Sequence, residues 1–182
     1  MNRIVECVPN FSEGRRPEVV DAIIKAITSV SNVYLLDREM DADHNRAVIT
    51  VVGAPEAIGQ AAILGVEAAM SYIDLTKHTG AHPRIGATDV IPFVPIRGVT
   101  LDECVQIAKN VGREIAGQFK IPVYLYEAAA TRPDRTNLET SAAASSKVCA
   151  TRSRAIRTAS RTLAKRAFIR LQAPPLSARE NR

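Results

Sequence analysis

The sequence predicts an α+β fold, a two-layer sandwich in which a mixed β-sheet carries helices packed on one face, with ferredoxin-like character. Two observations support this class. Short runs rich in β-branched residues alternate with segments of helical periodicity through the first 140 residues, and helix-start signals fall between them. The predicted order of elements is β-α-β-β-α-β-α-β.

The first elements follow from apolar spacing. Residues 3–8 read as a strand, and the turn at 9–14 leads into a helix that begins near Pro17. Residues 33–37 and 46–52 are predicted strands, separated by an acidic loop at 38–45. One buried stripe is expected on the helix, at Val20, Ile23, Ile24, Ile27 and Val30.

The later elements carry clearer boundary signals. Pro55 suits the first turn of an Ala-rich helix that runs to about Tyr72, and residues 88–96 form an apolar, β-rich stretch. Thr100 and Glu103 have the spacing of a capping box, and Gly117 is the expected end of the helix they begin. A last strand is predicted at residues 121–126.

Composition narrows the class of protein. The chain has 182 residues, 46% of them hydrophobic, which predicts a folded globule. We expect no membrane partner, because no apolar run approaches the roughly 18 residues of a membrane span, and no export, because residues 1–7 lack a signal-like apolar region. Three widely spaced cysteines without a Cys-x-x-Cys pair predict reduced thiols and a cytoplasmic location.

Positive charge is concentrated at one end of the chain. Residues 1–140 hold 14 Lys and Arg against 18 Asp and Glu, whereas residues 141–182 hold 10 against 1. The later segment, low in complexity and rich in Arg, Ser, Thr and Ala, predicts disorder or a loose basic helix. Binding to nucleic acid would have to use this tail. The sequence does not favour such a partner, because the Arg-rich run of the tail offers no aromatic platform on which bases could stack.

Residues 78–89 are the segment best suited to chemistry. They bring His78, His82, Arg84 and Asp89 together in a loop that precedes a predicted strand. A histidine there can accept and return a proton near neutral pH, because its ordinary pKa is about 6.5. The alternative is a purely structural turn shaped by its glycines and proline.

Several motifs together resemble one family. They are Val5-Glu6-Cys7-Val8-Pro9-Asn10-Phe11-Ser12-Glu13-Gly14, Leu35-Leu36-Asp37, Asn45-Arg46, and Gly80-Ala81-His82-Pro83-Arg84-Ile85-Gly86-Ala87. In this order they resemble the glutamate formimidoyltransferase family, whose domain also occurs in the bifunctional formimidoyltransferase-cyclodeaminase. The resemblance covers residues 1–140 and continues through Arg97-Gly98-Val99 and Pro122-Val123-Tyr124-Leu125-Tyr126.

The resemblance implies transfer of the formimino group of N-formimino-L-glutamate to N5 of tetrahydrofolate, in histidine degradation. The family's catalytic histidine falls on His82. Arg46 and Arg84 are candidates for binding substrate carboxylates, although Arg84 could instead pair with Asp89 or cap the loop. The partners expected from the resemblance are these small molecules, with tetrahydrofolate as co-substrate; a homo-oligomer is also expected.

Two further candidates have structural alternatives. Glu39 could stabilise a cationic amidinium or be a solvated acid, and Asn10 could contact the ligand or complete the turn after Pro9. No metal is expected: His44 and His78 with Asp41 or Asp43 could be written as a ligand set, but their spacing matches no specific site.

The resemblance also divides the chain. It assigns residues 1–140 to the N-terminal subdomain and leaves residues 141–182 as a basic tail. Shifted by one nucleotide near codons 140 and 141, this tail can be recoded as strings that resemble the start of the family's second subdomain. We therefore expect an out-of-frame tail and impaired transfer, because the folate of the family lies between two subdomains. The alternative is a noncatalytic fragment that binds folate or contacts another subunit.

Overall fold

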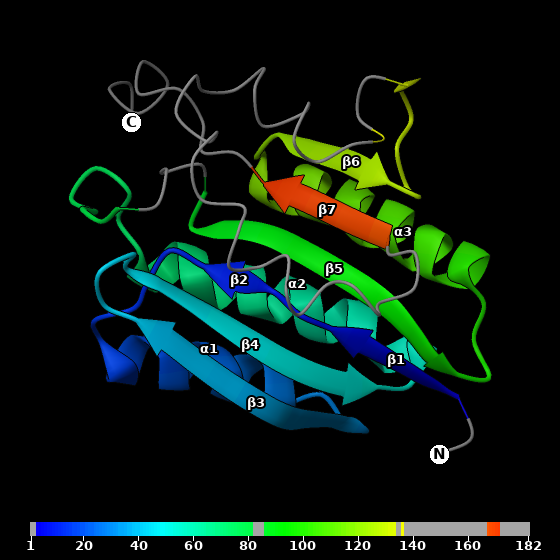
Figure 1. The fold of residues 1–182 in the computed structure, drawn as a ribbon, viewed down its shortest axis with the longest axis horizontal. Coiled ribbons are helices and arrows are strands. Elements are labelled where there is room, and N and C mark those ends of the chain that lie inside the picture. The colour runs from blue at the N-terminus through cyan, green and yellow to red at the C-terminus, as the bar shows by residue number, and fades with distance from the viewer. Residues whose placement is uncertain (1–2, 82–85, 134–135, 137–166, 172–182) are drawn as a thin grey trace.

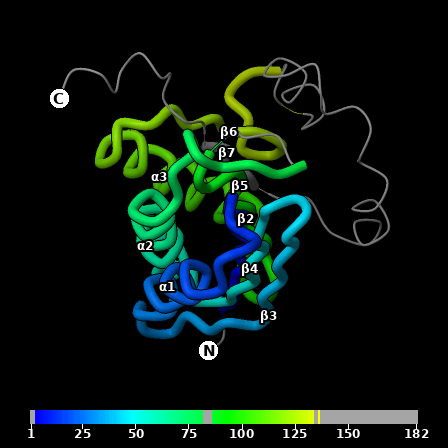
Figure 2. The backbone as a smooth tube through the Cα atoms, turned by 90° about the vertical axis from the view of Figure 1, so that its left-hand side faces the viewer, coloured from blue at the N-terminus to red at the C-terminus, as the bar shows by residue number. Residues whose placement is uncertain are grey.

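The computed structural model describes residues 3–81, 86–133, 136 and 167–171, the last five as backbone only. Figure 2 shows two layers, with the helices in one and the strands in the other. The elements in chain order are β1 (Ile4–Cys7), β2 (Asn10–Phe11), α1 (Pro17–Thr28), β3 (Val33–Asp41), β4 (Arg46–Gly53), α2 (Pro55–Tyr72), β5 (Thr88–Arg97), α3 (Leu101–Phe119), β6 (Val123–Glu127) and β7 (Ala167–Leu171).

The strands form one sheet in the order β3-β4-(β1, β2)-β5-β7-β6 (Figure 1). Strands β1 and β2 share one position, because both pair with β4 on one side and with β5 on the other. Each of these pairings is antiparallel. From β1 to β5 the βαββαβ order and the strand arrangement are those of a ferredoxin-like unit, to which α3, β6 and β7 are added. The predicted α+β two-layer class is confirmed, and every described strand pairing is antiparallel, where a mixed sheet was expected.

Strand β4 shows how the sheet separates its two faces. Its residues alternate between half-buried and buried from Arg46 to Gly53, the period-two pattern of a strand. Ala47, Ile49 and Val51 are at most 2% exposed and belong to the core between sheet and helices. The helices contribute the other half of this core, including Val20, Ile23 and Ile27 of the predicted stripe. The opposite face of the sheet bears no helix in the described part of the chain.

Three element predictions need correction. Residues 38–41 were expected in an acidic loop, but they extend β3, which is an edge strand in the described sheet and so tolerates polar side chains. Helix α3 passes through Gly117 and ends at Phe119, where Lys120 takes the left-handed conformation with φ 56°. Within the tail, which was expected to be disordered or a loose basic helix, Ala167–Leu171 form β7 between β5 and β6.

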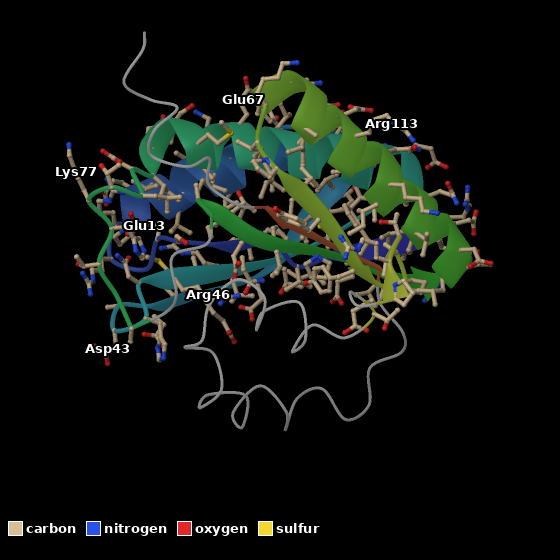
Figure 3. All side chains as sticks on the ribbon, turned by 90° about the horizontal axis from the view of Figure 1, so that it is seen from above. Glu13, Asp43, Arg46, Glu67, Lys77 and Arg113 are labelled. Atoms are coloured by element: carbon tan, nitrogen blue, oxygen red, sulfur yellow. The ribbon has the colours of Figure 1, made fainter. Side chains whose placement is uncertain are left out.

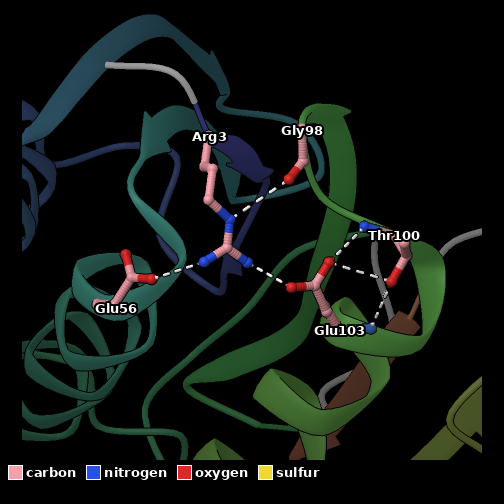
Figure 4. Close-up of polar contacts among 5 residues, drawn as sticks. All are labelled: Arg3, Glu56, Gly98, Thr100 and Glu103. Carbon is pink, nitrogen blue, oxygen red and sulfur yellow. Dashed lines mark hydrogen bonds and ion pairs between the residues drawn. The ribbon is translucent and has the colours of Figure 1, made fainter.

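The start of the chain is tied to both long helices. The Arg3 guanidinium forms ion pairs with Glu56 of α2, at 3.0 Å, and with Glu103 of α3 (Figure 4). Glu103 also completes the capping box predicted with Thr100, since each residue accepts a hydrogen bond from the other's backbone N–H. These contacts fix the amino ends of α2 and α3 against β1. None of the described helices combines the length and apolarity that crossing a membrane requires.

Candidate functional site

The predicted base is not among the described residues. His82 and Arg84 belong to residues 82–85, which are outside the described residues, so the structure does not test their roles. The backbone on both sides of this segment is described. Gly86 and Ala87 accept hydrogen bonds from Ser12, at 2.7 Å from its hydroxyl and at 2.9 Å from its amide. The backbone that follows residue 85 therefore lies against the connection between β2 and α1.

Two predicted substrate-binding residues lie in contact. The side-chain oxygen of Asn10 accepts hydrogen bonds from Nε and Nη2 of Arg46, at 3.1 and 2.5 Å. The Nδ2 group of Asn10 donates to the carbonyl of Val8 at 2.8 Å, so Asn10 also completes the turn after Pro9. Arg46 forms an ion pair with Asp89 at 3.4 Å, and their side chains are 19% and 7% exposed. Arg46 is thus aligned by an amide and a carboxylate.

Glu39 lies on the same face of the sheet. Its cross-strand partner is Val48 of β4, and Val48 is also the partner of Asn10. Direct partners share a face, and neighbouring strands are about 4.8 Å apart, so the Cα atoms of Glu39 and Asn10 are separated by about 10 Å. Glu39 is exposed, whereas Asn10 is half-buried. The sheet therefore brings together Asn10, Arg46 and Glu39 on the face away from the helices.

Glu13, which lies between β2 and α1, is a buried carboxylate. Its Oε1 accepts from the amides of Arg15 and Arg16, at 2.9 and 3.0 Å, and its Oε2 accepts from Nε of Arg16 at 2.6 Å. Burial alone would raise the pKa of Glu13, but these hydrogen bonds and the Arg16 charge outweigh it and lower the pKa. In Figure 3, Glu13, Asp43 and Lys77 lie at one end of the molecule, and Arg46 lies on the side of the sheet away from the helices.

The two described histidines have different surroundings. Nδ1 of His44 lies 2.5 Å from Oδ2 of Asp41, and both side chains are partly exposed. The backbone amide of His44 and then its ring lower the pKa of Asp41. His78 is 7% exposed, and its Nε2 lies 3.1 Å from the carbonyl oxygen of Asn45. Among the described residues, no three histidine, cysteine or acidic side chains are grouped so as to hold a metal ion.

A hollow of about 360 Å³ lies elsewhere, between α3 and β6. Its lining includes Lys109, Arg113 and Leu125, and it includes none of the predicted site residues. Asn10, Arg46 and Glu39 thus lie on the open sheet face and not in this hollow.

Sequence reasoning missed the residues that hold the loop. Ser12 and Asn45 were part of the family motifs, but neither was proposed as a functional residue. Asn45 has a positive φ of 51°, a conformation for which asparagine is enriched, and a lone Asn before a strand is the signal that could have pointed to it.

The fold and this cluster define an α+β subdomain whose open sheet face carries amide, guanidinium and carboxylate groups. Residues 4–170 match the family described as the formiminotransferase domain, N-terminal subdomain. The chain belongs to this family.

Similar proteins carry names of the same kind. The chain is 51% identical over 138 residues to the glutamate formimidoyltransferase of Streptococcus pyogenes serotype M1, a match that covers 76% of this chain and 46% of that protein. It is 50% identical over 135 residues to the glutamate formimidoyltransferase of Thermoplasma acidophilum, covering 74% and 45%. With the rat formimidoyltransferase-cyclodeaminase it shares 49% over 138 residues, covering 76% and 26%. The chain thus spans less than half the length of these relatives.

Proposed function

We propose that the chain takes part in formimidoyl transfer, moving the formimino group of N-formimino-L-glutamate to N5 of tetrahydrofolate in histidine degradation. The observation that carries this proposal is the identity of about half the residues to proteins named glutamate formimidoyltransferase. The small molecules are both substrates, with tetrahydrofolate as co-substrate, and the transfer uses no metal.

The proposed base is His82. As N5 attacks the amidine carbon, a bond forms between them and the amine must lose a proton, which a neutral imidazole accepts. The bond from that carbon to the glutamate nitrogen then breaks, and the imidazolium returns the proton to the leaving amine. The anchored ends of the 82–85 segment support this role, because a base contributes most when it is held against its substrate.

The substrate contacts are proposed for Arg46, Arg84, Asn10 and Glu39. Guanidinium groups bind carboxylates in a two-pronged geometry, which suits the two carboxylates of formiminoglutamate. Asn10 supports this role by aligning the Arg46 guanidinium. Glu39, on the same face, would stabilise the cationic amidinium.

Steady-state turnover with tetrahydrofolate and formiminoglutamate tests the proposal. His82→Ala should lower kcat by about 100-fold or more, the usual contribution of general-base catalysis. His44→Ala is a matched control, since it removes an imidazole that pairs with Asp41 at the other end of a short turn. Equal turnover in wild type and His82→Ala would remove His82 from the mechanism. Folate binding without turnover would support the noncatalytic alternative.

We also propose that residues 141–182 are an out-of-frame translation, as their abrupt change in charge and complexity suggests. The family match extends to residue 170, so a direct test is needed to separate this proposal from a divergent tail read in frame. The nucleotide sequence across codons 138–142 provides it. If the frame is shifted, residues 141–182 do not supply the start of the family's second subdomain, and transfer should be impaired.

A homo-oligomer in the cytoplasm is proposed as the working form. The exposed apolar side chains of β3, Tyr34 at 56% and Leu36 at 60%, support self-association. Sedimentation equilibrium of the full chain tests this, and a monomer at all concentrations would contradict it.

A further inference from the structure

Three segments that are distant in sequence meet at Asn45, a residue to which no function has been assigned above. Its side-chain oxygen accepts a hydrogen bond from the amide of Gly14 at 2.8 Å, and its Nδ2 group donates to the carbonyl of Thr79 at 2.9 Å. Its backbone carbonyl lies 3.1 Å from Nε2 of His78. Asn45 is itself 8% exposed. One residue thus joins the connection between β2 and α1, the turn between β3 and β4, and the segment that precedes residue 82.

The backbones approach so closely here that two glycines are required. A Cβ atom on Gly14 would lie 2.1 Å from the carbonyl oxygen of Asp41, and one on Gly80 would lie 2.6 Å from the carbonyl oxygen of His44. Real Cβ atoms do not approach backbone so closely, so any side chain at either position would push the segments apart. The contact of these segments at Asn45 therefore depends on glycine at both positions and is specific to this sequence.

Further bonds extend this contact toward residue 82. The amide of Ala81 donates to the carbonyl of Asp43 at 3.1 Å. Arg15 spans the same two segments, donating from Nε to the carbonyl of Ala42 at 2.8 Å and from Nη1 to the hydroxyl of Thr79 at 3.2 Å. Since Ser12 binds the backbone after residue 85, the residues around Asn45 hold one side of the segment and Ser12 holds the other.

We propose that Asn45 is a positioning residue, which fixes residues 78–81 against Gly14 and thereby sets where the chain enters the segment that carries His82. The inference rests on the proposed function of His82. Asn45 itself acts on the base through the backbone and does not touch the reacting atoms. Its amide is suited to this task because it offers an acceptor to Gly14 and a donor to Thr79 at the same time.

Hydrogen exchange on the full chain tests the positioning directly. Asn45→Gly keeps the left-handed backbone and removes both side-chain bonds, so protection of the Ala81 amide should fall by about tenfold while the amides of β4 are unchanged. Asn32→Gly is the matched control, because Asn32 is also left-handed, at φ 63°, and is exposed in the loop after α1. Unchanged protection of Ala81 in Asn45→Gly, or an equal loss in Asn32→Gly, would overturn the inference.

A second variant separates positioning from folding. Asn45→Asp keeps the acceptor for Gly14 and turns a carboxylate oxygen toward the Thr79 carbonyl, so it should lose protection at Ala81, and urea denaturation of the variant checks that it remains folded. Its kcat should fall by about tenfold or more with KM for formiminoglutamate nearly unchanged, because a displaced base slows the step without weakening substrate binding. A rise in KM at unchanged kcat would contradict the positioning role. Absence of turnover in the wild type would contradict the proposed function alone, since exchange at Ala81 still decides the role of Asn45.

Discussion

Replacing Glu13 by Gln should destabilise the fold although the two side chains have nearly the same shape. One carboxylate oxygen serves the amides of Arg15 and Arg16, and the other serves the Arg16 guanidinium. A Gln side chain has one acceptor oxygen, so its amide NH₂ would face donors on one of these two sides. Helix α1 has no side-chain bond from its N-cap residue, which leaves Glu13 as the group that receives these donors.

The magnitude follows from the hydrogen bonds that the substitution removes. Loss of a capping bond costs about 0.5–2 kcal/mol, and a hydrogen bond to a charged group is worth about 1.5–3 kcal/mol. The Arg16 side chain is 49% exposed, so solvent screening reduces its share. We therefore expect Glu13→Gln to lower the free energy of unfolding by about 2 kcal/mol, a shift of roughly 1 M in the urea midpoint.

Urea denaturation at pH 7 measures this change, with Glu18→Gln as the control. Glu18 lies in the first turn of the same helix but is exposed, so its loss should cost only about 0.3–1 kcal/mol through the helix dipole. Equal midpoints for the two variants would refute the reasoning, because they would show that the hydrogen bonds of the buried carboxylate add nothing.

The pH dependence supplies a second check on the same residue. The pKa of Glu13 is lowered by folding, so its contribution to stability is complete above the ordinary value of 4.5 and is lost as the pH falls through the folded pKa. The difference between wild type and Glu13→Gln should therefore be constant from pH 7 down to about 4.5 and shrink below it. A difference that grows on acidification would contradict the assigned direction.

Three other predictions concern separate parts of the fold. Gly14→Ala should lower the free energy of unfolding by more than about 3 kcal/mol, because its Cβ would clash with the backbone of Asp41 and Arg46. Gly117→Ala, whose Cβ would have no atom within 4 Å, should raise it by about 0.5–1 kcal/mol by stabilising α3. Thermal unfolding measures both changes. Cys7 and Cys104 should resist alkylation by iodoacetamide at pH 8 until the chain unfolds. Burial raises the pKa of Cys7, and burial together with the charge of Glu103 raises the pKa of Cys104 to about 11. Mass spectrometry of the labelled peptides measures the extent of alkylation. Arg3→Ala should cost no more than about 1 kcal/mol, and less at high salt, since its ion pairs are exposed; urea midpoints at low and high salt measure this.

The helix starts were predictable because single residues mark them. Pro17 and Pro55 occupy the first helical positions of α1 and α2, and Thr100 with Glu103 caps α3. The end of α3 was not predictable. Gly117 suggests that the helix stops there, but the helix continues to Phe119, and Lys120, a residue type that rarely adopts the left-handed conformation, ends it.

The edge strand and the site were harder to predict for a different reason. Residues 38–41 look like a loop because three of the four are charged, and only their pairing with residues 46–49 makes them a strand. The contact between Asn10 and Arg46 depends on the pairing of β2 with β4, and the role of Asn45 depends on two turns meeting. Such long-range contacts leave no periodic signal in a single sequence.

Because burial alternates along β4, neighbouring residues of this strand have different tasks: one stabilises the core, and the next contributes to the surface. The side chains at 47, 49 and 51 pack in the core against the helices. Those at 46, 48 and 50 lie on the face of the sheet that no described helix covers, where they can contact a ligand or another protein. Saturation mutagenesis of this strand should therefore give two interleaved profiles. Substitutions at odd positions should reduce the amount of folded protein, and substitutions at even positions should alter what the folded protein does.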